Sequence, residues 1–328
     1  MKKLASSVFV LLLTAAVALS ASAQTIRRVS ATTTGTNIYA TFALAQTAAT
    51  PGDIIQMEPG DYGFDMTISK NVTVVGPGYF LGTSQNTGLQ ANAQPAIVNL
   101  LHFTTGSTGA SVAGITASSA GFSASGVTMQ RCHITGETYI NYNGGLINNV
   151  NIRQNYLDGN LRHNNSTGGT NLLISNNIIL GYVSLNANSS GEFRQNVTGL
   201  QYSTFSLQNF NVINNYIGAY YTPSFTNCTV AYNAFYNTGV PTTNNNQNNV
   251  TIASVFANNN PTFDAHWQLK TGTNALRGTG ENGLDIGAFA GNSPYKLGGL
   301  PAIPAIYQLS NSVNGNTLNV NMSTRSNN

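Results

Sequence analysis

Apolar and polar residues alternate in short segments that recur about every twenty residues along the chain. The shared pattern is apolar-x-apolar-x-x-Asn-x-apolar. Its copies are Val127–Ile134, Val150–Leu157, Leu172–Ile179, Glu192–Val197, Phe210–Ile217, Cys228–Phe235 and Val250–Phe256. Alternation with period two predicts strands and not helices. Because no helical segments separate these strands, the repeat predicts an all-β fold, a parallel β-helix whose coils stack on one another.

One asparagine keeps its place in successive copies of the repeat. The members of this column are Asn155, Asn177, Asn196, Asn215 and Asn233, at spacings of 22, 19, 19 and 18 residues. An asparagine turned inward at a corner can bond to the asparagine one coil above and below, and it tolerates a left-handed backbone. We therefore expect these five residues to form a structural ladder inside the β-helix.

The N-terminus has the pattern of an export signal. Met1–Lys3 is positively charged, Leu4–Leu19 is mostly apolar, and Ala21–Ala23 fits a small-residue cleavage site. We interpret residues 1–23 as a signal peptide. The expected mature protein has no membrane span and is located outside the cell or on the cell surface.

Segments near both ends of the repeat resemble a known family. Tyr39–Gln46 and Pro51–Tyr62 near the start, with Trp267–Lys270 and Gly283–Phe289 near the end, resemble secreted β-helix proteins of the pectin-lyase-like superfamily. The similarity covers roughly residues 38–290. It implies a right-handed parallel β-helix (a solenoid) of about nine to ten coils with an N-terminal helical cap. The Pro-spaced segment Pro294–Tyr307 resembles a linker of Bacteroidetes-type secreted proteins, which implies a bacterial cell surface or extracellular location.

The chain divides into three parts by these criteria. Residues 1–23 are the expected signal peptide, and residues 24–290 the β-helix with its N-terminal cap and closing segment. Residues 291–328 form a tail with regularly spaced prolines, which predicts an extended chain. Within this tail, Thr317–Met322 alternates in the manner of a terminal strand.

Composition narrows the function. The chain has 13 Lys and Arg, 10 Asp and Glu, and 45 Asn, so that charged residues make up 7% against about 25% in an ordinary soluble domain. The net charge of +3 includes no basic run, which argues against nucleic acid as a partner.

The fold alone does not decide between enzymes and passive surface proteins. A polysaccharide hydrolase needs carboxylates on both sides of the scissile bond. Between residues 66 and 263 the only acids are Glu137, Asp158 and Glu192, and none is adjacent to another. Hydrolysis of a polysaccharide is therefore disfavoured.

A polysaccharide lyase that acts on an acidic glycan remains the alternative. Such an enzyme uses Lys or Arg as the base, and Ca²⁺ can neutralise the sugar acid. Arg153 and Arg194 occupy the same outward position of their repeats, two coils or about 10 Å apart. They are the candidate catalytic residues, and Ca²⁺ would be a cofactor in this case alone. Otherwise we expect no cofactor and no metal site.

Three residues are candidates for ligand binding. Arg131 adds a cation, and Tyr156 and Tyr216 share a repeat position where exposed rings would stack on sugars. Because so few acids and bases remain for chemistry, we expect a non-catalytic protein that contacts a polysaccharide, a cell-surface glycan or another surface.

Overall fold

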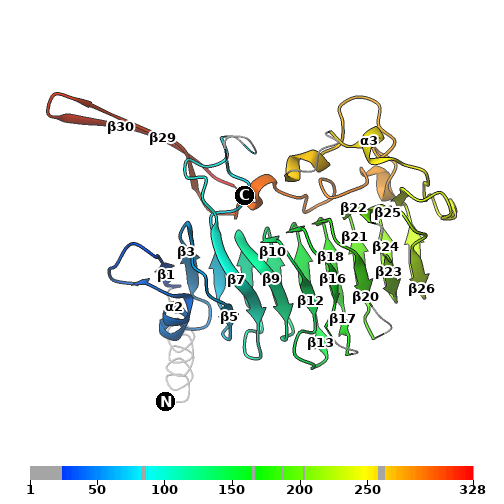
Figure 1. The fold of residues 1–328 in the computed structure, drawn as a ribbon, viewed down its shortest axis with the longest axis horizontal. Coiled ribbons are helices and arrows are strands. Elements are labelled where there is room, and N and C mark those ends of the chain that lie inside the picture. Colours follow the sequence, from blue (N-terminus) through cyan, green and yellow to red (C-terminus); the bar gives the residue numbers. More distant parts are fainter. Residues whose placement is uncertain are drawn as a thin grey trace, which may run out of the picture.

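The computed structural model describes residues 24–82, 86, 88–164, 167–185, 188–201, 204–257 and 263–327. The expected signal peptide, residues 1–23, lies outside the described residues. The described chain is a parallel β-solenoid of about nine turns with very little helix, and Figure 1 shows the coils stacked side by side. This confirms the predicted fold class.

Each complete coil contributes strands to three columns, which we number in the order that the chain visits them. The first column is an 11-stranded sheet, in spatial order β2 (Ile38–Tyr39), β1 (Ile26–Val29), β3 (Ile54–Met57), β6 (Thr73–Val75), β8 (Ser111–Ala113), β10 (Thr128–Gln130), β14 (Asn151–Arg153), β18 (Leu172–Ser175), β21 (Gly191–Arg194), β24 (Phe210–Ile213) and β27 (Thr229–Ala231).

The second and third columns belong to one 15-stranded sheet, because β7 (Ala96–Phe103) and β9 (Ile115–Phe122) are long enough to span both. The second column continues through β4 (Gly60–Asp61), β11 (His133–Ile134), β15 (Tyr156–Leu157), β19 (Ile178–Ile179), β22 (Val197–Gln201), β25 (Tyr216–Ala219) and β28 (Ala234–Phe235). The third contains β5 (Met66–Ile68), β12 (Thr138–Ile140), β16 (Leu161–His163), β20 (Val183–Leu185), β23 (Ser206–Gln208) and β26 (Ser224–Thr226). A small sheet pairs β13 (Ile147–Asn148) with β17 (Gly169–Thr170).

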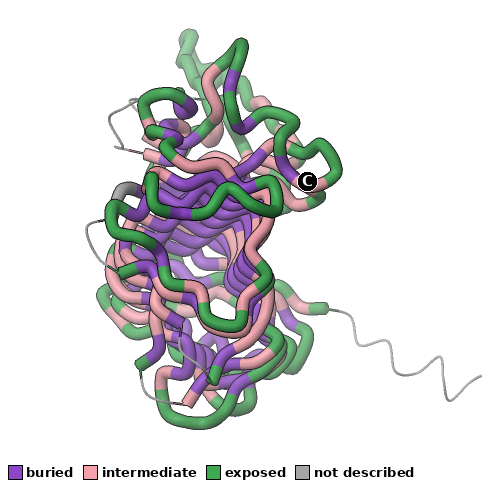
Figure 2. Tube along the Cα trace, turned by 90° about the vertical axis from the view of Figure 1, so that its right-hand side faces the viewer, coloured by how far each residue is buried: buried purple, intermediate pink, exposed green. Residues whose placement is uncertain are grey.

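The core follows from the period-two pattern. In the first column the central residue of each strand points inward and lies in register with its neighbours, as for Met129, Ile152, Ile174, Phe193 and Val212. All five are 0% exposed. Figure 2, viewed from the β26 side, shows the buried positions lining the inside of the stack.

A helix covers the N-terminal end of this core, as the sequence predicts. Helix α2 (Phe42–Ala48) starts at Thr41, whose hydroxyl accepts a hydrogen bond from the Leu44 backbone amide. Its buried side chains include Phe42 and Ala45. Because a helix ends with unpaired carbonyl groups, a cation there is stabilising, and Lys70 donates to the carbonyls of Gln46, Thr47 and Ala49.

The column of asparagines forms a continuous buried ladder. The Nδ2 of Asn155, Asn177, Asn196 and Asn215 each donates to the Oδ1 of the next member at 2.9–3.0 Å. Each Oδ1 also accepts the backbone N–H of the preceding member. The Nδ2 groups donate further to carbonyls of the preceding coil, such as Ile174 O for Asn196. The polar atoms of these fully buried side chains are thus satisfied.

The sharp backbone turn lies one residue earlier than expected. The residues with positive φ are those immediately before the ladder asparagines, namely Gln154, Asn176, Gln195, Asn214 and Tyr232. The ladder residues themselves do not have the left-handed conformation. Placing the turn at the preceding residue directs the asparagine side chain inward and the preceding side chain outward.

The C-terminal part of the chain returns across the coils. It includes α3 (Ile252–Val255) and the 3₁₀ turns Asp264–Trp267, Glu281–Gly283 and Leu297–Gly299. We call residues 281–300 the strap. Figure 1 shows this segment running along the upper side of the solenoid toward its N-terminal coils.

The tail contains one more strand than the sequence predicts. Strands β29 (Ala305–Asn314) and β30 (Thr317–Arg325) form an antiparallel hairpin. Only β30 overlaps the expected strand Thr317–Met322. Gly315, with φ of 60°, supplies the turn, a conformation that glycine adopts without steric cost.

The ladder generates a stability prediction. Asn196→Ala removes the oxygen that accepts both the backbone N–H and the Nδ2 of Asn177. Buried donors left unpaired cost about 1–3 kcal/mol each, so we expect the free energy of unfolding to fall by about 3 kcal/mol. Urea denaturation followed by circular dichroism measures this loss.

Asn149→Gly is the matched control. Asn149 is an exposed corner residue with φ of 55°, a conformation that glycine keeps, so the loss should stay below about 1 kcal/mol. Equal losses in the two variants would contradict a stabilising role for the buried ladder.

Candidate functional site

The predicted catalytic arginines lie on one outward column, but they differ in their partners. Arg153 is in register with Ser175, and Ser175 with Arg194. Arg194 pairs with Glu192 at 3.3 Å and with Glu281 at 3.4 Å. Arg194 therefore already has two carboxylate partners, with which the carboxylate of an acidic sugar would have to compete.

Arg153 has a neutral partner. Its Nε donates to the Gln130 Oε1 at 3.0 Å, and it forms no ion pair with a described residue. Arg153 is therefore the predicted residue that remains available to an anionic ligand.

Arg131 is engaged by the strap. It has a positive φ of 51°, and its Nη1 donates to the Leu300 carbonyl at 2.8 Å. Its Nε donates to the Gln154 Oε1 at 2.9 Å. Burial and the neighbouring charge of Arg153 lower the pKa of Arg131. This predicted ligand-binding residue thus attaches the strap.

Tyr156 and Tyr216 do not form the exposed stacking surface that we expected. They are 1% and 0% exposed. The Tyr156 ring packs edge-on against Phe80, with centroids 5.0 Å apart, and the Tyr216 hydroxyl donates to the Val250 carbonyl at 2.9 Å. Burial raises the pKa of both phenols. Val250, whose carbonyl accepts the Tyr216 bond, lies 34 residues further along the chain. Local spacing therefore could not reveal this burial.

The outward side chains at the turns of four successive coils form hydrogen bonds with the strap backbone. Gln154 donates to Pro294 O at 2.7 Å, Asn176 to Ala288 O at 2.9 Å, and Gln195 to Asp285 O at 3.4 Å. At the next coil, Asn214 Oδ1 accepts the Glu281 backbone N–H at 2.7 Å. Each of these turns thus supplies one polar group to the strap backbone.

Two clusters of titratable groups lie near the strap. His133 Nε2 and Asp158 Oδ2 are 2.7 Å apart beside the Phe80 ring. Asp264 is 0% exposed and accepts bonds from Asn86, Tyr295 and the Gly298 backbone N–H. Burial raises the pKa of Asp264. We interpret the Asp264 cluster as an attachment of the C-terminal segment to Asn86, whereas the His133–Asp158 pair packs among Tyr79, Phe80 and Tyr156.

The described surface has an open groove over strands β21, β24 and β27, with a volume of about 580 Å³. Its lining residues are Thr170, Asn171, Ser190, Gly191, Glu192, Asn209, Phe210, Asn211, Asn227 and Thr229. We call it the amide groove, because asparagine supplies more of its lining than any other residue type. Register pairs place Glu192, Asn211 and Thr229 side by side on successive strands.

The wall of the amide groove is a second set of stacked corners. Asn171, Asn209 and Asn227 have positive φ of 50–62°. Each lies one or two residues before a first-column strand, namely β18, β24 and β27. Asn227 Nδ2 donates to Asn209 Oδ1 at 2.9 Å, and Asn209 Nδ2 to Ser189 O at 3.2 Å. In the coil between Asn171 and Asn209, Ser190 holds the equivalent position and Gly191 follows it, in register with Leu172 and Phe210. A Cβ on Gly191 would lie 2.0 Å from Leu172 O. This close approach requires glycine.

A buried histidine supports the same wall. His163 Nε2 and Ser189 Oγ are 2.5 Å apart, and Ser189 Oγ accepts the Gly169 backbone N–H at 3.1 Å. Ser190 and Thr170, the residues that follow Ser189 and Gly169, line the groove. His163 is thus a positioning residue for the groove wall.

The amide groove is nearly free of charge. Glu192 is its one ionisable lining residue, and from Gln195 to Phe263 the sequence contains no Asp, Glu, Lys, Arg or His. The described residues include no group of three or more His, Cys, Asp or Glu that could hold a metal ion. Hydrogen bonding by amides and hydroxyls is therefore the main chemistry that this surface offers.

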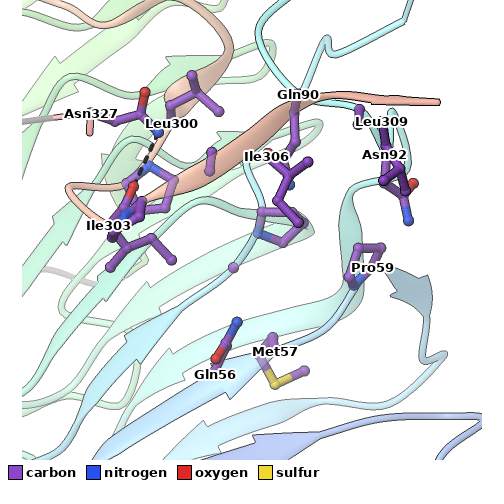
Figure 3. A pocket seen from close by; sticks show the side chains of 16 residues that line it. Gln56, Met57, Pro59, Gln90, Asn92, Leu300, Ile303, Ile306, Leu309 and Asn327 are labelled. Carbon is purple, nitrogen blue, oxygen red and sulfur yellow. Dashed lines mark hydrogen bonds between the residues drawn. The ribbon is translucent and has the colours of Figure 1, made fainter. Parts of the chain in front are cut away.

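A second hollow of about 430 Å³ lies between the first coils and the base of the hairpin. Figure 3 shows Ile306 extending from the hairpin toward Pro59 and Met57. Amide groups from Gln90 and Asn327 lie among its other lining residues, and none of the lining residues is ionisable. We call this hollow the hairpin pocket. Its apolar lining suits an apolar group better than a sugar.

The sequence reasoning missed the amide groove. Asparagine recurs just before several first-column strands, at Asn149, Asn171, Asn209 and Asn227, and this recurrence could have indicated a second column. Because the inner ladder already accounted for much of the asparagine content, the outer column was not distinguished from it.

No family model, curated protein or solved structure matches this chain. Among the helices of the described residues, none has the length and apolar character needed to span a membrane.

The supporting histidine generates a pH prediction. Burial lowers the pKa of His163 to about 4, from an ordinary value of 6.5. The folded chain therefore binds this proton less tightly than the unfolded chain, and stability is lost as the pH falls from about 6.5 toward 4. We expect this group to lower the free energy of unfolding by about 2–3 kcal/mol at pH 4.5.

His163→Gln keeps a hydrogen-bonding group near Ser189 but does not titrate. Urea denaturation at several pH values between 7.5 and 4.5 should show a smaller acid loss for this variant than for the wild type. Superimposable pH profiles of the two proteins would show that His163 does not contribute.

Proposed function

We propose that this chain is an exported, non-catalytic surface protein that binds a neutral glycan in the amide groove. The single observation that carries the proposal is the groove itself, which combines asparagine amides, hydroxyls and only one carboxylate. We also propose that the chain belongs to the pectin-lyase-like superfamily of secreted Bacteroidetes-type proteins, on the resemblance of its end segments and of its Pro-spaced tail.

The hydrogen-bonding groups of the groove support a sugar as the ligand. An amide both donates and accepts, which matches a hydroxyl that does the same. Asn211 and Thr229 project side by side from neighbouring strands, so hydroxyls along one edge of a glycan can meet successive coils at a spacing of about 4.8 Å. The groove volume falls in the range of about 300–1,000 Å³ that is typical of ligand sites.

The charges around the groove support binding without cleavage. Glu192, its one carboxylate, pairs with Arg194. Glycoside hydrolysis requires two carboxyl groups that flank the bond, and the groove supplies one. A neutral glycan also lacks the acidic proton that a lyase removes.

The lyase alternative retains one supporting observation, which is that Arg153 has no carboxylate partner among the described residues. This alternative is tested by incubating the mature chain with alginate, pectate and chondroitin in the presence of Ca²⁺. Absorbance from the unsaturated product, abolished by Arg153→Ala, would establish a lyase and overturn the non-catalytic proposal.

The binding proposal predicts a specific loss of affinity. We expect Asn211→Ala to weaken binding of a neutral oligosaccharide about tenfold, since it removes hydrogen bonds to the ligand worth roughly 1–1.5 kcal/mol. A neutral-glycan array identifies the ligand, and titration calorimetry with the corresponding oligosaccharide measures the affinity.

Asn151→Ala is the matched control. Asn151 is in register with Leu173, and Leu173 with Glu192, so Asn151 lies in the same outward column as Glu192. It does not line the groove, and the affinity of the Asn151→Ala variant for the oligosaccharide should therefore stay within about twofold of the wild type. Failure to bind any neutral glycan, or equal losses in the two variants, would contradict the proposal.

A further inference from the structure

The hairpin of β29 and β30 has one apolar and one polar face. Figure 1 shows it projecting away from the coils. The directly opposed pairs of the apolar face are Leu309–Met322, Asn311–Val320 and Val313–Leu318. The pairs Ser310–Asn321 and Ser312–Asn319 belong to the polar face. Seven of the 13 exposed large apolar side chains of the described residues lie on this hairpin.

Such a surface is unfavourable when it faces water. Val313 is 73% exposed and Leu318 is 63% exposed. A two-stranded hairpin is marginally stable by itself, and contiguous apolar patches of this kind mark interaction sites. Burial of this face against a partner would stabilise both the hairpin and the complex.

The apolar face continues into the hairpin pocket. Leu309 pairs with Met322 on the hairpin and also lines the pocket, as does Ile306. A bulge between Ile306 and Gln308 brings Ile306 and Leu309 to the same side. One apolar surface therefore extends from a concave base to a convex tip formed by Val313 and Leu318.

We propose that the hairpin is a self-association element. Two copies of this chain pack apolar face to apolar face about a two-fold axis, and the tip of each hairpin fills the pocket at the base of the other. The inference does not depend on the proposed glycan binding, because the hairpin and the amide groove share no lining residue.

The geometry favours a second copy as the occupant. Val313 is seven residues from Ile306, which corresponds to about 20 Å along a strand. In a two-fold antiparallel arrangement, the tip of each copy reaches the pocket of the other copy, so each convex end meets a concave one. Isologous interfaces have this self-complementarity.

The charge distribution also favours a second copy. Residues 297–324 contain no ionisable acid or base apart from the Tyr307 phenol, so two identical faces meet without repulsion. Arg325 lies at the base, where its guanidinium covers Tyr307 and donates to Leu89 O at 2.8 Å. The face thus presents no charge to attract an anionic lipid or an acidic partner.

Sedimentation velocity of the mature chain, residues 24–328, tests the proposal. We expect a concentration-dependent dimer whose dissociation constant rises at least tenfold in the double variant Val313→Asn and Leu318→Asn. Ala91→Trp, at an exposed residue of the pocket rim, should weaken the dimer in the same way. Ser312→Gln, on the polar face, is the control and should leave the dissociation constant unchanged. In all variants the thermal midpoint of the solenoid should equal that of the wild type.

Cross-linking identifies which surfaces meet. Ala91 is bonded to Ile306 at the base, so cysteines at residues 91 and 318 are too far apart within one copy to form a disulfide. In a Cys228→Ser background, which removes the half-buried natural thiol, Ala91→Cys with Leu318→Cys should form a covalent dimer on oxidation.

At about 100 µM even a weak homodimer is populated. A wild-type chain that is still monomeric at this concentration would overturn the proposal. A dimer insensitive to both the tip and the rim variants would also overturn it. Flotation of monomers with neutral phosphatidylcholine vesicles, lost in the tip variant, would assign the face to a lipid surface instead.

Discussion

The buried hydrogen bond between one asparagine and the next is the interaction on which the rest of this structure depends. A coil must turn sharply between its first and second strands, and the turn leaves polar backbone atoms in the interior. The side chains of Asn177 and Asn196 satisfy these atoms and bond to each other. Because the bond forms only when neighbouring coils are aligned, it also fixes their register.

This constraint has consequences on the outside of the molecule. The residue before each ladder asparagine adopts the left-handed conformation, and its side chain points outward. Gln154 and Asn176 in these places bind the strap backbone. The strap then covers Tyr156 and its neighbours in the second column. One local geometry, repeated along the solenoid, therefore organises both the inner ladder and the docking of a distant segment.

The same residue type supplies the surface of the amide groove. Asparagine tolerates a left-handed backbone at the corners before the first-column strands, as at Asn209 and Asn227, and its amides remain beside open space. A surface of amides needs few charges to remain hydrated. The low content of charged residues and the high content of asparagine are thus two aspects of one architecture, which favours recognition through hydrogen bonds over acid–base chemistry.

Much of the fold could be predicted from the sequence, because the signals were local. Period-two alternation indicated the strands as far as Phe235, but it was wrong for the last copy, Val250–Phe256, which contains helix α3 (Ile252–Val255). The spacing of Asn155 through Asn233 indicated the ladder, and Phe42–Ala48 lies in the segment expected to form the helical cap. The candidate site was less accessible. The burial of Tyr216 depends on a segment beyond residue 250, and the arginines acquire their partners through contacts such as Arg131 with Leu300. Such contacts join residues far apart in sequence, and no periodicity encodes them.

The asparagines of the solenoid divide into a buried ladder and an exposed corner set. Side-chain amide hydrogen exchange, followed by nuclear magnetic resonance on isotope-labelled asparagine, tests it most directly. We expect slow exchange for Asn177, Asn196 and Asn215, and fast exchange for exposed corner residues such as Asn149 and Asn227. Exchange of the ladder amides as rapid as that of the corner amides would contradict it.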